Sequence, residues 1–432
     1  METRLAEPWH TSRYNTFSEP FIMLNVDAAL AAILEHVRPF EPSECPLGDV
    51  LGLTLAEEIV SGQDSPPFDK ALMDGYAVRS DDVSSGTATL DVIEEITAGC
   101  TPTKPVTPGT ATRIMTGAPI PDGADVVVRV EHSKFDESTN QVRLETTDQS
   151  PGTSILRRGA AMKIGETILP SGRVLGPQEI GVLAELGHAR VMIYRRPKVA
   201  VLATGDELVP IDETPGPGQI RNSNETMLCA QLRRAGADPV PLGIARDDRE
   251  DLAAKIREGL KADILLLSGG VSAGKLDLVP SELEAAGVRE VFHKVRVKPG
   301  KPIWFGILDE DKKDVEAGQN RRLVFGLPGN PVSSMVCFEL FARTAIRRRM
   351  NASHPEPPQK TGQLTTSFRH TGDRPTYHPA KIHWTNAGPR IIPLPWQGSA
   401  DLRATADANA LAVFPAGDQD YQQGDIVDFV QL

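Results

Sequence analysis

Three short loops in the second half of the chain combine hydroxyl groups, glycines and carboxylates. Residues 204–207 (TGDE), 268–277 (SGGVSAGKLD) and 328–331 (PGNP) each follow a run of apolar residues. Hydroxyls and bare glycine backbone let N–H groups approach an anion closely, and carboxylates are ligands that a hard cation such as Mg²⁺ prefers. The loops therefore indicate a site for an anion and a divalent cation, although turn glycines with capping hydroxyls would share this composition.

These loops and one basic turn supply the first candidate site residues. Glu207 and Asp277 are the carboxylates that suit Mg²⁺. Lys298 and Lys301 flank a rigid turn, and two cations at a fixed spacing can bind phosphate or another oxyanion; a solvated basic turn is the alternative. The candidate contacts to an anionic ligand in the first two loops are Thr204, Ser268, Gly269, Gly270 and Ser272.

Two further patterns match known motifs only in part. Residues 216–222 (GPGQIRN) precede a helical pattern but lack the third glycine of a dinucleotide loop, and no P-loop sequence occurs. Residues 270–274 match the G-x-S-x-G elbow of serine hydrolases, which needs a strand running into the serine and a helix directly after it. Here the apolar run stops at Leu267 and Pro280 delays the next helix, so we do not expect Ser272 to be a nucleophile.

Two polar strings occur in the first half of the chain. Residues 68–78 place Asp69 and Asp74 near an aromatic residue and a glycine. Residues 113–125 include Thr116 in a turn rich in glycine and proline. From residue types alone, each string predicts a structured loop between strands.

The elements that must position the three loops follow from hydrophobic patterning. Between residues 198 and 349, apolar runs alternate with helical patterns, one of which has Asp248 as its cap. This alternation predicts an α/β domain with a parallel sheet, whose ligands bind at the carboxyl ends of the strands. The polar residues 309–321 interrupt the pattern as a surface loop. The predicted strands are 199–203, 239–244, 264–267, 290–297, 302–306 and 323–327.

The rest of the chain has a different texture. Asn25 is a plausible cap for a helix over residues 26–37. Strand-like runs fill residues 75–133, and a short helix is predicted over 176–187. After a proline-rich linker only strand-like runs follow, which predicts a small all-β domain at the C-terminus.

Composition excludes several classes of protein. Lys and Arg number 46 against 58 Asp and Glu, for a net charge of −12, so a duplex-DNA binder is not expected. The four cysteines are widely spaced, which fits a reducing cytosol and not a disulfide framework. No apolar run is long enough for a membrane span, and residues 1–21 form a polar arm without the hydrophobic core of a signal peptide.

Six strings identify a resemblance when taken in order. MDGYAV (73–78), MTGAPIPDGADVVV (115–128), TGDEL (204–208), SGGVSAGKLD (268–277), KPGKP (298–302) and LPGNPVS (327–333) together closely resemble the molybdopterin molybdenumtransferase family, which includes MoeA and the C-terminal domain of gephyrin. The resemblance runs from about residue 22 to the C-terminus.

The resemblance implies a multidomain α/β and β protein. Residues 1–21 would be a flexible arm, and residues 22–60 with 157–194 would form a helical domain. Residues 61–156 would be an inserted β-rich domain. Residues 195–350 would be a central molybdopterin-binding-like α/β domain with a parallel sheet, and 351–432 a β-barrel. Family members are elongated homodimers whose active site lies between the α/β domain of one subunit and the β-rich domain of the other.

The implied reaction inserts molybdate into adenylylated molybdopterin, releases AMP and yields the molybdenum cofactor. Mg²⁺ would be held by carboxylates from among Asp277, Glu207, Asp247 and Asp248, and Lys298 and Lys301 would hold anionic ligands. Asp74 and Thr116 match functional positions contributed by the partner subunit. The loop that shapes the pocket is matched by Pro328, Asn330, Pro331 and Ser333.

The sequence leaves some alternatives open. A non-catalytic molybdopterin-binding or scaffold protein is one, and a tungstate-preferring homologue is another, because molybdate and tungstate are oxyanions of nearly equal size. An upstream adenylyltransferase and downstream molybdoenzymes are possible partners. The chain departs from the family pattern at Ala71-Leu72, where a small polar pair is usual, and at Ala160-Ala161, where the family is commonly acidic.

Overall fold

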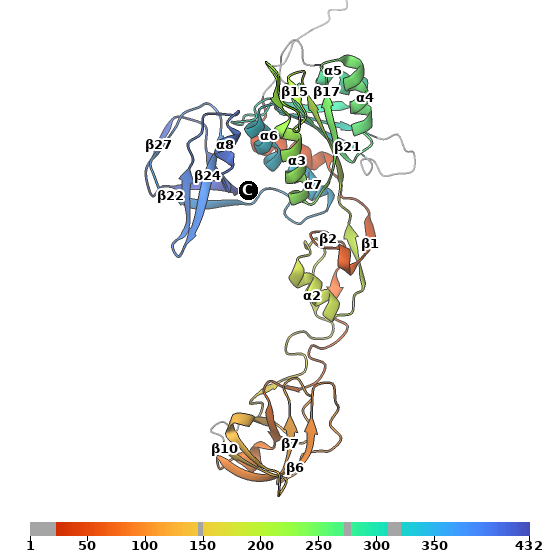
Figure 1. Cartoon of the computed structure of the whole chain (residues 1–432), viewed down its shortest axis with the longest axis vertical. Coiled ribbons are helices and arrows are strands. Elements are labelled where there is room, and N and C mark those ends of the chain that lie inside the picture. Colours follow the sequence, from red (N-terminus) through yellow and green to blue (C-terminus); the bar gives the residue numbers. More distant parts are fainter. Residues whose placement is uncertain (1–22, 146–149, 272–277, 310–320) are drawn as a thin grey trace, which may run out of the picture. The chain divides into compact units, whose positions relative to one another are not determined.

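The computed structural model describes residues 23–145, 150–271, 278–309 and 321–432. The chain divides into two compact units (Figure 1). Pro42–Ile193 form the first, called here the β-rich unit, and Tyr194–Leu432 with the residues up to Glu41 form the second, called the main unit. Asp277, Ser272 and the centre of the predicted surface loop at 309–321 lie outside the described residues.

A six-stranded mixed sheet forms the centre of the main unit. Four of its strands are parallel neighbours, and the last two continue the sheet antiparallel. The order across the sheet is β17 (Asp238–Ala245), β14 (Lys198–Thr204), β18 (Ile264–Ser268), β21 (Arg322–Leu327), β20 (Trp304–Leu308) and β19 (Arg289–His293).

The expected all-parallel sheet is therefore wrong at one edge. β19 and β20 are joined by residues 294–303, which contain no helix. A parallel return needs a long crossover, usually a helix, whereas a short connection permits antiparallel pairing. The strand predicted over 290–297 also ends early, at His293.

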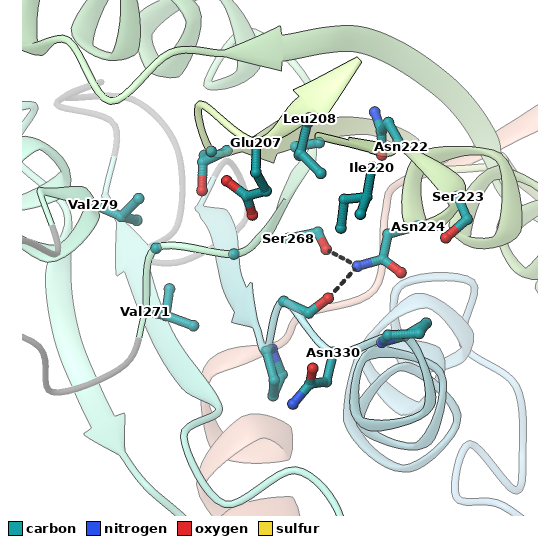
Figure 2. A pocket seen from close by; sticks show the side chains of 18 of the residues that line it. Glu207, Leu208, Ile220, Asn222, Ser223, Asn224, Ser268, Val271, Val279 and Asn330 are labelled. Atoms are coloured by element: carbon teal, nitrogen blue, oxygen red, sulfur yellow. Dashed lines mark hydrogen bonds between the residues drawn. The ribbon is translucent and has the colours of Figure 1, made fainter. Parts of the chain in front are cut away.

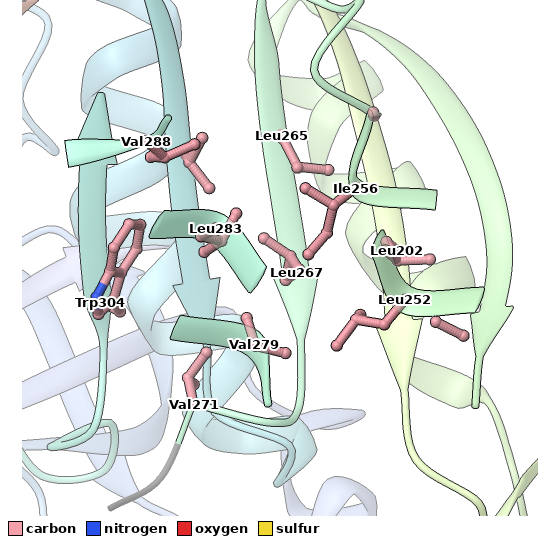
Figure 3. Packing of buried hydrophobic residues seen from close by; sticks show 13 residues of the cluster. Leu202, Leu252, Ile256, Leu265, Leu267, Val271, Val279, Leu283, Val288 and Trp304 are labelled. Atoms are coloured by element: carbon pink, nitrogen blue, oxygen red, sulfur yellow. The ribbon is translucent and has the colours of Figure 1, made fainter. Parts of the chain in front are cut away.

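Helices cover the sheet where the sequence predicted them. α4 (Arg249–Gly259) begins at Asp248, whose side chain accepts hydrogen bonds from the next turn, and α5 is Val279–Ala285. Apolar side chains of β14 and β18 pack against α4 and α5 in a buried cluster (Figure 3). α3 (Ser223–Ala235) packs against β14 and β17. The long predicted helix at 332–349 consists of α6 (Pro331–Cys337), a π-helical turn (Phe338–Ala342) and α7 (Arg343–Arg349).

One buried carboxylate anchors the beginning of the sheet. Asp263, just before β18, accepts two hydrogen bonds of 2.8 Å from the Arg195 guanidinium and one of 2.8 Å from the Lys198 backbone N–H. Burial by itself raises the pKa of Asp263, but these donors outweigh burial, and the pKa lies below its ordinary value. Arg195 and the start of β14 are thus tied to the beginning of β18.

The first helix belongs to the main unit, in contrast to the prediction. α1 (Val26–His36) begins at Asn25, whose side chain accepts a hydrogen bond from the Ala28 N–H at 2.7 Å. It packs against α7 and the π-helical turn. The helical spacing of its apolar residues predicted this helix correctly. Amphipathicity, however, does not specify which surface covers the apolar face.

The predicted helical domain is built largely from strands. Within the β-rich unit, the segments 42–60 and 157–193 contribute one α-helix, α2 (Pro177–Glu185). Their strands are β1 (Pro42–Pro46), β2 (Thr54–Leu55), β3 (Ile59–Val60), β12 (Thr167–Leu169) and β13 (Arg190–Tyr194). β1, β13 and β2 form one small sheet, and β3 pairs with β12.

The rest of the β-rich unit is a six-stranded sheet, in line with the strand-like pattern over 75–133. Its order is β8 (Val126–Arg129), β5 (Gly75–Val78), β7 (Thr110–Ile114), β6 (Thr87–Ile96), β10 (Gln141–Glu145) and β9 (Ser133–Asp136). A separate two-stranded ladder pairs β4 (Lys70–Ala71) with β11 (Ile155–Leu156). In the sequence, β4 precedes the strands of the six-stranded sheet and β11 follows them.

The C-terminal residues form a closed barrel, which agrees with the all-β domain predicted from the strand pattern and with the barrel that the resemblance implied. The strands, in barrel order, are β22 (Gln359–Leu364), β25 (Gly388–Pro393), β24 (Thr376–Thr385), β26 (Ala410–Phe414) and β28 (Ile426–Gln431). Buried Phe414 and Phe429 belong to the barrel's apolar core. Across the described ranges, no helix has the length and apolar character that crossing a bilayer requires.

Candidate functional site

A cavity of about 730 Å³ opens at the carboxyl ends of β14, β18 and β21 (Figure 2). All three loops predicted from the sequence reach it, because parallel strands end at the same edge of a sheet. The predicted residues that line it are Thr204, Glu207, Asp247, Ser268, Gly269, Gly270, Pro328, Asn330 and Pro331.

The glycine loop after β18 depends on two residues without side chains. Gly269 and Gly270 have φ values of +101° and +64°. A Cβ on Gly269 would lie 2.6 Å from the Thr204 carbonyl oxygen, and one on Gly270 would lie 2.6 Å from a methyl group of Val279. The backbone of this loop therefore lies directly against β14 and α5, and it lines the cavity without side chains in the way.

Two carboxylates reach the cavity from the β14 side. Glu207 folds back over Gly205, where a Cβ would overlap its carboxylate, and no hydrogen-bond partner for that carboxylate exists among the described residues. Asp247 lines the same cavity, and its backbone N–H donates to Asp206 at 3.1 Å. Hard oxygen donors of this kind fit Mg²⁺, although the described residues include no cluster of three or more potential metal ligands.

Four other predicted residues do not line this cavity. Asp248 caps α4, where its carboxylate accepts hydrogen bonds from the N–H groups of residues 250 and 251 at 3.0 Å each. Lys298 lies beside the barrel, with its backbone hydrogen bonded to that of residues 375 and 377. Lys301 is exposed, and Ser333 is buried in α6. Lys298 thus lies next to the barrel, and neither lysine is among the residues that line the cavity.

Asp74 and Thr116 meet in the β-rich unit. The backbone N–H and the hydroxyl of Thr116 both donate to one Asp74 oxygen at 2.7 Å. These two hydrogen bonds lower the pKa of Asp74. Thr116 therefore orients the exposed Asp74 carboxylate, whose second oxygen faces no donor among the described residues.

Sequence reasoning missed the polar residues that line the cavity just before and at the start of α3, which are Arg221, Asn222, Ser223 and Asn224. The Asn224 side-chain amide donates to the Ser268 hydroxyl at 2.8 Å and to the Gly329 carbonyl oxygen at 2.7 Å. Asn224 is the second residue of α3, directly after the incomplete phosphate-loop pattern at 216–222. That pattern placed a helix start near the sheet edge and was the only available signal. Ala400 and Leu402, in the connection between β25 and β26, also line the cavity and gave no signal.

Sequence models of known domain families match nearly the whole chain. Residues 24–187 match the MoeA N-terminal region (domain I and II). Residues 200–348 match a probable molybdopterin binding domain, and residues 361–432 match the MoeA C-terminal region (domain IV). The three matches do not overlap, and only short segments separate them.

Full-length relatives and solved structures agree with these matches. A protein of Bacillus subtilis (strain 168) named molybdopterin molybdenumtransferase is 33% identical over 413 residues, which is 94% of this chain and 94% of the relative. One of the same name from Staphylococcus aureus (strain COL) is 34% identical over 413 residues, again 94% of each chain. The crystal structure of the molybdopterin biosynthesis moeA protein from Pyrococcus horikoshii OT3 matches with a TM-score of 0.77 and 27% identity, covering 95% of this chain and all (100%) of that one.

Proposed function

The chain belongs to the molybdopterin molybdenumtransferase family, and on this premise we propose that it inserts molybdate into adenylylated molybdopterin, releasing AMP and forming the molybdenum cofactor. It is a transferase of molybdenum cofactor biosynthesis. The observation that carries the proposed reaction is the 730 Å³ cavity, because it combines glycine backbone, hydroxyls and carboxylates at one sheet edge.

The cavity wall suits an anionic substrate. Gly269 and Gly270 present backbone that a phosphate oxygen can approach closely. Ser268 adds a hydroxyl beside them. These groups would bind the phosphoanhydride and orient its phosphorus, which is the main contribution a protein makes to phosphoryl chemistry. No covalent intermediate with the protein is needed.

We propose that Glu207 and Asp247 hold a Mg²⁺ ion together with Asp277. The two described carboxylates share the cavity, and Glu207 lacks a competing partner among the described residues. A bound Mg²⁺ would neutralise charge on the phosphate oxygens as AMP leaves. Asp248 is set aside, because its carboxylate already caps α4.

We propose further that the protein works as a cytoplasmic homodimer. The dimer rests on the family resemblance, in which Asp74 and Thr116 act in the site of the partner subunit. The exposed Asp74 carboxylate, held by Thr116 and with one oxygen left for a ligand, suits such a role. The cytoplasmic location rests on the wide spacing of the cysteines.

The direct test mixes the purified protein with adenylylated molybdopterin, Mg²⁺ and molybdate and follows AMP by chromatography. We expect AMP release that requires both molybdate and Mg²⁺. The Glu207→Gln variant should bind the substrate but release AMP at least ~100-fold more slowly, since a metal ligand is lost. Binding of substrate by the wild type without any AMP release would reject the enzyme and favour a binding or scaffold protein.

A further inference from the structure

The Asn224 amide joins two of the loops that form the cavity. Its nitrogen contacts the Ser268 hydroxyl, at the end of β18, and the Gly329 carbonyl oxygen, after β21 (Figure 2). The side chain comes from the first turn of α3, which is itself capped by Asn222. Asn224 thus connects both loops to a third element.

The contact with Gly329 fixes the direction of the other hydrogen bond. A carbonyl oxygen can only accept, so the Asn224 atom that faces it must be the NH₂ nitrogen. The same nitrogen then donates to Ser268, and the Ser268 oxygen is an acceptor in that contact. The serine hydroxyl proton must therefore point elsewhere, and no acceptor for it exists among the described residues.

We propose that Asn224 is a positioning residue that holds Ser268 as a hydrogen-bond donor to an acceptor oxygen of the substrate. Ser268 is only 2% exposed but lines the cavity, so a ligand bound there would lie next to its hydroxyl. The inference rests on the proposed function, in which that oxygen belongs to the phosphate part of adenylylated molybdopterin. It adds a residue outside the predicted loops. It also assigns the Ser268 hydroxyl the role of donor, whereas a serine hydroxyl by itself can donate or accept.

The test is a double-mutant cycle between Asn224→Leu and Ser268→Ala. The dissociation constant of adenylylated molybdopterin is measured by equilibrium dialysis, which needs no turnover. Each single variant should weaken binding about 10- to 100-fold, the loss typical of a hydrogen bond to a charged group. In the Ser268→Ala background, Asn224→Leu should cost clearly less than in the wild type, because the hydroxyl it orients is gone and only the contact with the Gly329 carbonyl remains to be lost.

A second variant and a control separate positioning from folding. Asn224→Asp keeps the shape of the side chain, but its carboxylate would accept a hydrogen bond from the Ser268 hydroxyl and turn that proton away from the substrate. When Ser268 is present, this variant should therefore bind adenylylated molybdopterin more weakly than Asn224→Leu does. Gln141→Leu removes an amide that donates to Asp91 in the β-rich unit and should leave binding unchanged. An equal loss from Asn224→Leu with and without the Ser268 hydroxyl would overturn the inference.

The two levels of the proposal fail differently. Wild-type binding without AMP release would reject the proposed reaction, while the cycle would still decide the role of Asn224. Intact AMP release with an additive cycle would reject the role of Asn224 and leave the reaction standing.

Discussion

The turn at residues 298–302 offers a sharp test of packing in the main unit. Gly300 has a φ of +118°, and Cys337, which is fully buried in α6, lies directly against it. A Cβ at position 300 would overlap the Cys337 sulfur. The same sulfhydryl donates to the Gly300 carbonyl oxygen at 3.5 Å. Gly300→Ala therefore meets two separate obstacles, the backbone conformation and the buried sulfur.

The magnitude follows from these two obstacles. A non-glycine residue in such a conformation costs about 1–3 kcal/mol, and forcing extra volume into a packed site costs a further ~1–3 kcal/mol. We expect Gly300→Ala to lower the free energy of unfolding by about 2–6 kcal/mol in total. Cys337→Ala alone should cost about 1 kcal/mol, as for loss of one buried heavy atom.

The two changes should compensate when combined. Removing the sulfur makes room for the new methyl group, so the double variant keeps the backbone cost and loses the overlap. It should be more stable than the sum of the single effects by ~1–3 kcal/mol.

Urea unfolding followed by tryptophan fluorescence measures this, since Trp304, Trp384 and Trp396 lie in the main unit and the β-rich unit contains no tryptophan in its sequence. Gly218→Ala is the matched control: its φ is +79°, but nothing lies within 4 Å of its Cβ, so the backbone cost alone is expected. Strictly additive effects of Gly300→Ala and Cys337→Ala would refute the reasoning.

Three further predictions concern other parts of the chain. Asp263→Asn should lower the free energy of unfolding by about 1.5–3 kcal/mol, because it removes the charge that accepts the hydrogen bonds of the half-exposed Arg195 guanidinium. The pKa of Asp263 is depressed in the folded state, so ionised Asp263 should stabilise the fold above the unfolded pKa of about 3.9. This stabilisation should be lost as the pH falls through the lower folded pKa. Acid unfolding of the wild type and the variant, compared over this pH range, would show the loss. Asp74→Asn and Glu207→Gln proteins should each be inactive, yet subunit exchange between them should restore roughly a quarter of wild-type AMP release. The reason is that about half of the exchanged dimers are mixed, and each mixed dimer has one intact site of two. No recovery after verified exchange would reject the shared site. Replacing residues 310–320 by a short turn should change stability by less than ~1 kcal/mol, because closure entropy varies slowly with loop length, and loss of AMP release would show the loop to be functional.

The part of the site that could be predicted from the sequence consists of residues that come directly after a strand. The loops after β14, β18 and β21 carry glycines, hydroxyls and a carboxylate directly after buried apolar runs, and parallel strands bring such ends together without further information. The caps Asn25 and Asp248 were predicted for a similar reason, because a cap acts on the turn that follows it.

The sequence alone determined which elements exist and which strand ends carry polar groups, since both depend on short-range patterns. Only the tertiary structure decided how distant segments combine. It placed α1 in the main unit, paired β19 and β20 antiparallel, moved Lys298 from the cavity to the side of the barrel, and brought Asn224 within hydrogen-bond distance of Ser268 and Gly329. These outcomes depend on packing between residues far apart in the chain. A local pattern shows that a face is apolar or a side chain polar, but it does not show what that face or side chain will contact.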